Sequence, residues 1–557
     1  MSASRAGLAD LILTGGQIYT VDEERRWASA VAIKAGRITA VGSDSEVRQR
    51  AGDETEIVDL DGRMAMPGVI DIHNHHMMGG RADLYELKFP AAAALEQIVD
   101  AVRGAVEDTK AGEWIIGSQW GSNRGSTLNT GEALAALDSV SPKNPVMLRD
   151  DTCHNRWVNS RALAAADLTR ETPDPENGSF GRDPHSGELT GMLIERAAAP
   201  VERAALESGI FSEEGYRAAA ARAVAILNSL GVTGFVDAAA MLPTLEALKG
   251  LDDRGELTAW AVAAMPAVEP SFLFGIAGDE LMAKRETYRS AHFKPDFVKV
   301  FLDGVPPAKT AAFVEPYQAD PILGCCFRGE TQMSVPELIR WIGKCEKQGL
   351  AVKIHCAGDA AVRQALDAIE VVRTFNGSTH LIHHIAHASY IQPDDIPRFA
   401  ELGVAGDLSP IIWYPTPILE GAKAALGIER ALQFWPNRDL HEAGALLAAG
   451  SDWPVVPNPD PWDGIEGMIT RQNPAGDYPG ESLWPEQALD LPTVLEIYTR
   501  NAAKAAGLGN ITGSIEVGKS ADILVLDRNL FQIPAHEIAE TQVLTTYFEG
   551  RAVYERG

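Results

Sequence analysis

Cysteine and membrane-spanning sequence are both scarce in this chain. Its 557 residues include five cysteines, a small and odd number that excludes a disulfide framework and fits a reducing compartment. No uninterrupted apolar run approaches the ~20 residues that a bilayer-spanning helix needs. The N-terminal sequence MSASRAGLADLILTGG has no basic cluster followed by a long apolar run, so it predicts no secretory signal. We therefore expect a cytoplasmic protein that does not enter a membrane.

Positive charge is also in short supply. The sequence has 49 Lys and Arg residues against 77 Asp and Glu, a formal charge of −28. Because such an excess of acid repels phosphate, we expect no nucleic-acid partner and no attraction to anionic membranes. Phosphate-binding P-loops and the GxGxxG strand-turn-helix signature are missing, which argues against a nucleotide cofactor. The remaining composition is ordinary for a globular protein, with 45% apolar residues that can bury a large core.

Eight strand-like apolar runs alternate with helical stretches through the middle of the chain. They begin near residues 68, 231, 257, 296, 351, 379, 403 and 445. Segments between them, such as SVPELIRWIGKCEKQ, carry apolar residues at helical spacing. Eight strands separated by helices predict an α/β fold, a distorted (β/α)8 TIM barrel over residues 66–508. The interval of about 80–225 is too long for one crossover helix, so it predicts an inserted subdomain with strand-like EWIIGSQWG and NPVMLRDD.

The two ends of the chain share a different pattern. Residues 1–65 and 509–557 alternate apolar and polar side chains in short runs broken by Gly and Asp. Neither end has enough strands to be stable alone. We therefore expect the two ends to pair into one small composite β-sandwich domain.

The sequence GVIDIHNHH places several polar side chains on the first strand of the predicted barrel. Asp71, His73 and His75 occupy alternate positions, so their side chains leave the same face of the strand. Two imidazoles at this spacing can share one metal ion. The alternative is a pair of unconnected surface or core histidines.

Three further residues favour the metal. His355, His384 and Asp452 each lie at or just beyond the C-terminal end of another predicted strand, where this architecture assembles active sites. Histidines and carboxylates gathered in one buried place are costly unless something satisfies them. A divalent metal ion does so.

Lys299 lies in the middle of the apolar run DFVKVFLDG, on the predicted fourth strand. A buried ammonium group is expensive to desolvate, so this position needs an explanation. One explanation is a salt bridge, for example to Asp303. The other is that CO₂ carbamylates the amine, which then bridges two metal ions as an anionic ligand.

Several motifs, taken in order, resemble one family. They are GVIDIHNHH, KVFLDG, HCAGDAA, the HH pair, GSDWP, TRNAAKAAG and GSIEVGKSADILVLD, and as a set they are similar to the metal-dependent amidohydrolase superfamily. More narrowly they resemble the amidohydrolase-3 branch, which includes N-substituted formamide deformylase and the YtcJ-like proteins. The resemblance covers almost the whole chain and implies the barrel and the composite β-sandwich.

The resemblance also implies roles for residues of this chain. The more buried metal would be bound by His73, His75 and Asp452. Lys299 would bridge, and His355 with His384 would hold a second ion, although not every relative keeps two. Relatives of this branch commonly have Glu-His on the sixth strand, where this chain has His383-His384. This departure removes a carboxylate near the predicted site and leaves the electrostatics on the substrate side open.

The implied ligand set defines a reaction. Imidazole and carboxylate suit Zn²⁺, with Mn²⁺, Fe²⁺ or Co²⁺ as alternatives. Bound Zn²⁺ lowers the pKa of its water from about 15.7 to roughly 7. We expect the resulting hydroxide to attack the carbonyl carbon of a small amide-like substrate, while Asp452 takes the water proton and passes it to the departing nitrogen. His355 or His384 would stabilise the developing oxyanion.

The prediction is therefore a hydrolase of non-peptide C–N bonds in an amide, a formamide or an N-acyl amine. Deamination of a heterocycle, or hydrolysis of an ester or carbamate, uses nearly the same ligands and stays open. A non-catalytic scaffold barrel is disfavoured because the whole ligand set is present. Homo-oligomers are common for this resemblance, but no residue here establishes one.

Substrate contacts are predicted less directly. The stretch DDTCHNRWVNSRAL in the insertion is similar to one that contributes to the substrate pocket in this branch. It makes His154 and Trp157 candidates for substrate contact, and Trp120 and Trp453 are candidates as well. The alternative for these aromatic side chains is packing in a core.

Overall fold

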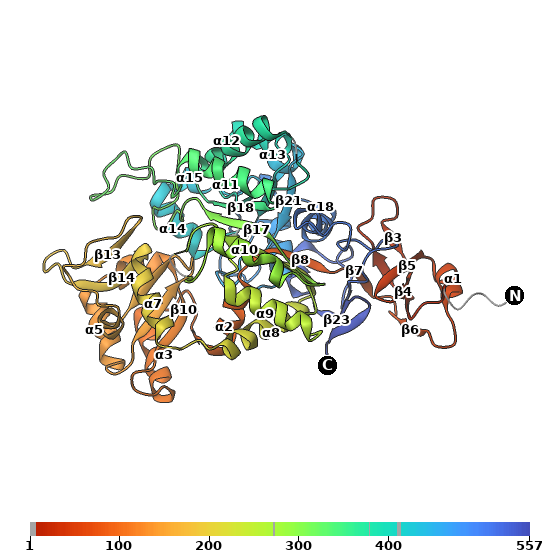
Figure 1. The fold of residues 1–557 in the computed structure, drawn as a ribbon, viewed down its shortest axis with the longest axis horizontal. Helices are drawn as coiled ribbons and strands as arrows, with labels where there is room; N and C mark the ends of the chain where they lie inside the picture. The colour runs from red at the N-terminus through yellow and green to blue at the C-terminus, as the bar shows by residue number, and fades with distance from the viewer. Residues whose placement is uncertain (1–6, 271–272, 378, 409–413) are drawn as a thin grey trace.

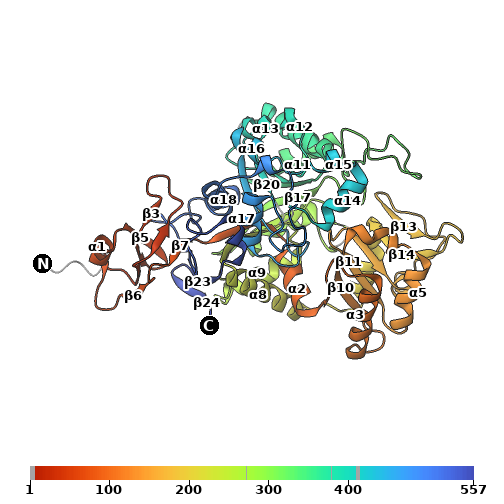
Figure 2. The ribbon, with the colours of Figure 1, turned by 180° about the vertical axis from the view of Figure 1, so that it is seen from behind.

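The computed structural model describes residues 7–270, 273–377, 379–408 and 414–557. A central barrel lies between the inserted subdomain at one end and the sheets built from the chain termini at the other, which gives the elongated outline of Figures 1 and 2. Residues 1–6 of the predicted N-terminal segment, and Ser409 and Pro410 of the seventh strand-like run, lie outside the described residues. No helix within the described ranges is both long and apolar enough to cross a membrane.

All eight predicted barrel strands form one parallel sheet, which confirms the fold class. Neighbours pair in chain order from the first strand, β8, to the last, β21. The first and last strands, β8 and β21, lie side by side and close the barrel. Along this seam the described residues form no ladder of backbone hydrogen bonds. Asp71 joins the two strands instead, because its carboxylate accepts the Ser451 backbone N–H at 3.0 Å and the Ser451 hydroxyl at 2.6 Å. The strands are β8 (Val69–Asn74), β15 (Val232–Asp237), β16 (Trp260–Pro266), β17 (Phe293–Phe301), β18 (Ala351–Cys356), β19 (His384–His387), β20 (Ala405–Leu408) and β21 (Leu446–Ala449).

Helices cover the outside of the barrel because each carries an apolar stripe. In α12 (Asp359–Asn376) the buried residues Val362, Ala365, Leu366 and Ile369 recur every three or four positions. Figure 1 shows α11 to α13 on one side of the barrel and α8 and α9 on the other. The other helices here are α2 (His76–Tyr85), α8 (Glu213–Ser229), α9 (Leu242–Asp253), α10 (Gly278–Tyr288), α11 (Val335–Lys347), α13 (Ile396–Glu401), α14 (Pro417–Leu426), α15 (Ile428–Ala431), α16 (Asn437–Glu442), α17 (Pro461–Thr470), α18 (Leu491–Tyr498) and α19 (Arg500–Ala505).

The inserted subdomain has its own mixed sheet and its own core. The sheet order is β13-β14-β12-β11-β10-β9. The strand-like runs EWIIGSQWG and NPVMLRDD form β10 and β11, as predicted. Its elements are β9 (Leu87–Lys88), α3 (Leu95–Asp108), β10 (Ile115–Trp120), α4 (Gly125–Leu128), α5 (Gly131–Val140), β11 (Val146–Asp150), β12 (Asn155–Val158), α6 (Ser160–Ala165), β13 (Gly178–Arg182), β14 (Leu189–Glu195) and α7 (Ala199–Glu207).

The two chain ends meet in one sheet. Its order, β24-β23-β22-β7-β2-β3, places the C-terminal β22 antiparallel to the N-terminal β7, with Ile523 opposite Pro67. A second sheet, β5-β4-β1-β6, comes from the N-terminal segment alone. The predicted boundaries at 65 and 509 stay predictions. The strands are β1 (Leu11–Thr14), β2 (Gln17–Tyr19), β3 (Trp27–Ala28), β4 (Ala30–Lys34), β5 (Arg37–Gly42), β6 (Glu56–Asp59), β7 (Met64–Pro67), β22 (Ile523–Leu526), β23 (Val543–Phe548) and β24 (Arg551–Glu555), and α1 (Asp44–Val47) joins β5 to β6.

Candidate metal centre

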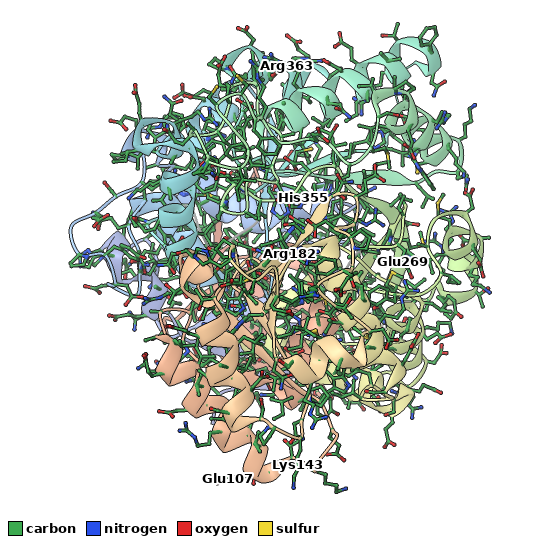
Figure 3. All side chains as sticks on the ribbon, turned by 90° about the vertical axis from the view of Figure 1, so that its left-hand side faces the viewer. Glu107, Lys143, Arg182, Glu269, His355 and Arg363 are labelled. Carbon is green, nitrogen blue, oxygen red and sulfur yellow. The ribbon has the colours of Figure 1, made fainter. Side chains whose placement is uncertain are left out.

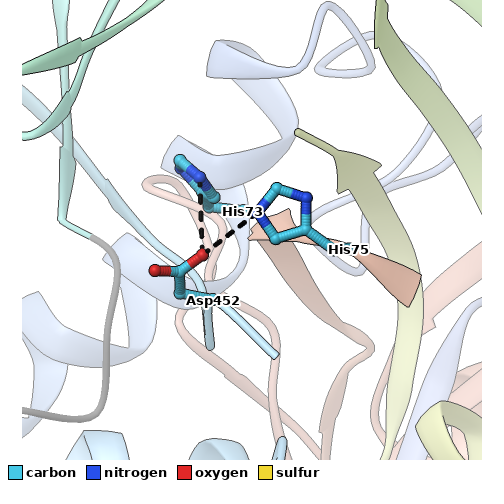
Figure 4. A group of neighbouring side chains, drawn as sticks. All are labelled: His73, His75 and Asp452. Atoms are coloured by element: carbon cyan, nitrogen blue, oxygen red, sulfur yellow. Dashed lines mark ion pairs between the residues drawn. The ribbon is translucent and has the colours of Figure 1, made fainter. Parts of the chain in front are cut away.

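Two histidines and one aspartate meet where the first and last barrel strands end. His73 lies in β8, His75 follows it, and Asp452 comes three residues after β21. The Asp452 Oδ1 atom is 3.7 Å from His73 Nε2 and 3.5 Å from His75 Nε2. Figure 4 marks both contacts with dashed lines. One ligand atom from each residue lies within 4.8 Å of the others, and all three residues are buried. This spacing and this donor set fit one divalent cation held by two imidazoles and a carboxylate.

The second ring nitrogen of His73, Nδ1, determines which tautomer the imidazole adopts. Its Nδ1 lies 2.9 Å from Asp407 Oδ2, and the same carboxylate contacts the buried ammonium of Lys353. Because a carboxylate only accepts, Nδ1 carries the hydrogen and Nε2 keeps its lone pair toward Asp452. Burial lowers the pKa of His73 to about 3, so the ring is neutral. The described neighbours therefore prepare His73 as a ligand.

Lys299 reaches the same place from β17. Its Nζ lies 3.3 Å from His73 Nε2. Burial, and then the nearby Lys353 charge, lower the pKa of Lys299 to about 7. The Asp303 carboxylate faces elsewhere, because it accepts the backbone N–H groups of Ala312 and Gly358 at 3.0 and 2.9 Å. Among the described residues, Lys299 and Asp303 form no ion pair, which disfavours the salt-bridge explanation.

Two further imidazoles face this group, His355 at the end of β18 and His387 at the end of β19. Their ring centroids are 4.3 Å apart, and the His387 centroid is 4.7 Å from that of His73. His387 Nδ1 lies 3.9 Å from Asp452 Oδ2. Burial holds the pKa of both histidines well below the ordinary value, so both are neutral donors. His355 is near the middle of the molecule when it is viewed from the inserted subdomain (Figure 3).

The structure corrects the prediction for His384. In the sheet register His384 pairs with Lys353, whereas His355 pairs with Ala386, so His384 lies deeper in the barrel. Its Nδ1 accepts from Lys353 Nζ at 3.0 Å, and its Nε2 donates to the Ala505 carbonyl at 3.0 Å. Both ring nitrogens are used, and His387 occupies the predicted position instead.

His383 lies on the other side of this strand. Its Nδ1 accepts the Val352 backbone N–H at 3.0 Å, and its Nε2 lies 3.1 Å from Glu346 of helix α11. The ring therefore packs on the outer side of the strand, away from the cluster formed by His73, His75 and Asp452.

A pocket of about 800 Å³ opens beside the cluster. Its polar wall includes the cluster residues His75, His355, His387 and Asp452. Most of the remaining wall is apolar, with Phe301, Val305, Ile418, Phe434, Trp435 and Val455. A small molecule with apolar substituents therefore fits the pocket better than a strongly charged one.

His154 is the predicted substrate residue that the structure brings to this pocket. It comes from the inserted subdomain, and its ring centroid lies 5.7 Å from that of His355. Both carboxylate oxygens of Glu195 lie 3.0 Å from His154 Nδ1. Burial alone would lower the pKa of His154, but the Glu195 charge outweighs it and raises that pKa. The insertion thus supplies a hydrogen-bond donor across from the metal ligands.

The three predicted tryptophans do not line this pocket. Trp120 and Trp157 are buried in the core of the inserted subdomain, and Trp120 Nε1 donates to the Leu148 carbonyl at 3.1 Å. Trp453 packs against Gly79 so closely that a Cβ there would lie 2.3 Å from the indole ring. Packing therefore explains all three side chains.

Sequence reasoning missed several residues of the site. His387 was masked by the preceding His383-His384 pair, although it ends its strand. Its φ of 68° breaks the in-out alternation and turns the side chain toward the barrel mouth. Lys353 and Asp407 had a readable signal, since each is a charged residue inside an apolar strand.

Comparison with known proteins agrees with this geometry. The sequence profile of the Amidohydrolase family matches residues 56–554. N-substituted formamide deformylase of Arthrobacter pascens is 28% identical over 99% of both chains. The protein LONG AFTER FAR-RED 3 of Arabidopsis thaliana is 30% identical over 98% of this chain and 92% of its own.

A solved structure supports the same assignment. The crystal structure of an uncharacterized metal-dependent hydrolase from Pyrococcus horikoshii shares 26% identity and a TM-score of 0.73, over 94% of this chain and 99% of that one. The ordered motifs, the eight-stranded barrel and the profile match agree with one another. The chain belongs to the amidohydrolase family of hydrolases.

Proposed function

We propose that this hydrolase cleaves the C–N bond of a small amide, a formamide or an N-acyl amine. The observation that carries the proposal is the convergence of His73, His75 and Asp452 at the edge of a largely apolar pocket. The similarity to an N-substituted formamide deformylase over nearly the full length of both chains supports a C–N bond as the target.

The metal would be held by His73, His75 and Asp452. We propose Zn²⁺, with Mn²⁺, Fe²⁺ or Co²⁺ as alternatives, because imidazole and carboxylate ligands suit these ions. When bound, such an ion makes water acidic enough to attack at neutral pH and polarises the substrate carbonyl. His355 and His387 would either hold a second ion or donate to the oxygen of the substrate.

Asp452 would move the proton. Its Oδ1 faces the two histidines, while the side chain also lines the pocket. A carboxylate in this position can accept the proton of the attacking water and release it to the departing nitrogen, which leaves as a neutral amine. One residue then serves as general base and general acid in turn.

Lys299 is proposed to be carbamylated. CO₂ adds to the neutral form of an amine, and the lowered pKa of about 7 makes this form available at physiological pH. The carbamate would place a negative charge near His73. It would also be near a metal ion held by His73, His75 and Asp452, or one held by His355 and His387. This charge would offset the cost of burying a cation among neutral histidines.

Two measurements test the proposal. Purified protein is first analysed for bound transition metals by mass spectrometry, and it is then assayed with N-substituted formamides, N-acyl amines, heterocyclic amines and esters. We expect near-stoichiometric metal, loss of activity on chelation, and release of a primary amine from amide substrates. Ammonia release from heterocycles alone would indicate a deaminase, and ester cleavage alone an esterase. A folded, metal-free and inactive protein would indicate a scaffold.

A further inference from the structure

A second cavity lies on the other side of His75. It is open to solvent and has a volume of about 660 Å³, and it shares His75 and Met78 with the pocket at the metal centre. Its walls include the apolar side chains of Met77, Phe211 and Met241, and the carboxylates of Glu202 and Asp237. A molecule that fills this cavity therefore touches the side of a proposed metal ligand.

Arg81, on helix α2, is the basic residue of this cavity. Its Nε donates to Glu86 Oε1 at 3.2 Å, and its guanidinium carbon lies 4.3 Å above the centre of the Phe211 ring. These two contacts hold the plane of the group. Among the described residues, no hydrogen bond is made by the two terminal nitrogens, and the side chain is 12% exposed. Arg81 therefore offers the cavity two terminal N–H groups that are held in place and have no hydrogen-bond partner among the described residues.

The buried charges around Arg81 do not balance. Arg149 pairs with Glu86, and Arg156 donates to Glu202 at 2.6 Å. Within this group three guanidinium groups share two carboxylates, which leaves one positive charge in excess. The remaining carboxylate of the cavity wall, Asp237, is paired with His76, whose Nδ1 lies 2.6 Å from Asp237 Oδ2. Since a buried charge without a partner is costly, the arrangement favours a monoanion in the adjoining space.

We propose that this cavity binds the carboxylate of a ligand with an apolar body, with Arg81 as its anchor. Arginine presents two parallel N–H groups that match the two oxygens of a carboxylate. Tyr216 lines the same cavity, and a phenol hydroxyl is a further hydrogen-bond donor. The apolar wall would hold the rest of the ligand.

This inference rests on the proposed function in one respect. If the protein hydrolyses amides, the carboxylate belongs to the substrate, as in an N-acyl amino acid, or to the acid that hydrolysis releases. The binding site itself needs no turnover, so the two proposals can fail separately.

Isothermal titration calorimetry tests the binding site directly. The probes are 3-phenylpropionate and its neutral isostere 3-phenylpropionamide, titrated into the full-length protein. We expect the acid to bind about tenfold or more tightly than the amide. Arg81→Met should remove this preference, and Arg81→Lys should weaken it, because lysine keeps the charge but loses the fork.

Arg103→Met is the matched control. Arg103 lies on the exposed face of the insertion and pairs with Asp100, so this variant loses the same charge far from the cavity. We expect it to bind both probes like the unaltered protein, and circular dichroism checks that each variant folds. Equal binding of acid and amide, no binding of the acid at millimolar concentration, or an unchanged preference in Arg81→Met or Arg81→Lys would overturn the proposal.

Discussion

Alanine substitutions of His384 and His387 would separate a supporting histidine from one that faces the metal centre. The His384 ring is fully buried between the Lys353 ammonium and the Ala505 carbonyl, with a hydrogen bond of 3.0 Å to each. Removing it leaves two buried polar groups short of a partner, at about 1–3 kcal/mol each, and opens a cavity. We expect His384→Ala to lower the free energy of unfolding by about 2–5 kcal/mol.

The effect of His387→Ala should be different in kind. This ring lines the pocket and faces His355, His73 and Asp452. We expect a smaller loss of stability in metal-free protein but a weaker hold on metal, by about tenfold or more. His384→Ala should keep its metal.

Urea unfolding of chelator-treated protein, followed by tryptophan fluorescence, measures the first quantity. Metal content after dialysis against graded Zn²⁺ measures the second. Loss of metal from His384→Ala at unchanged stability, with metal and stability both kept in His387→Ala, would show that His384 faces the metal centre and His387 does not.

Three further outcomes are expected. Asp452→Asn should retain most of the metal, because two histidines remain, but should lower kcat by about 10²–10⁴ as proton transfer is lost; a near-normal kcat would remove Asp452 from that role. Lys299→Ala should reduce the metal content and be partly rescued by short carboxylic acids, whereas unchanged metal without rescue would contradict the carbamate. The pair of His154 and Glu195 should stabilise the fold above the ordinary pKa of Glu195, 4.5, and below that of His154, 6.5. As the pH rises through the raised pKa of His154, this contribution is lost, so the stability difference between wild type and His154→Gln, measured by urea unfolding, should shrink; a growing difference would refute the assignment.

The barrel could be predicted from the sequence because its signals are local. Each strand is a short apolar run bounded by turns, and the helices between them show regular spacing, so the order of elements follows from the pattern alone. His73, His75, His355 and Asp452 could be located for the same reason, since each lies at or beyond the end of such a run. Lys299 could be located because it is a charged residue in the middle of one.

The remaining features of the site could not be predicted, because they depend on backbone conformation and strand register, which the spacing of apolar residues does not reveal. His387 enters the site through a left-handed backbone conformation, and His384 is withdrawn from it by the register of its strand. Buried tryptophans are equally compatible with a pocket and with a core, which is why Trp120 and Trp157 were misplaced. Glu195 was missed because its partner, His154, is distant in the sequence.

The metal centre needs residues from both sides of the seam between β8 and β21, which are the first and the last barrel strands to be synthesised. Asp71 and Ser451 are 380 positions apart, and the Asp452 amide donates to the His73 carbonyl at 2.6 Å across the same junction. Because the chain is made from its N-terminus, the centre cannot be complete before the eighth strand has been synthesised. An ion held by His73, His75 and Asp452 would join the last strand to the first, so its binding would add to the stability of the closed barrel.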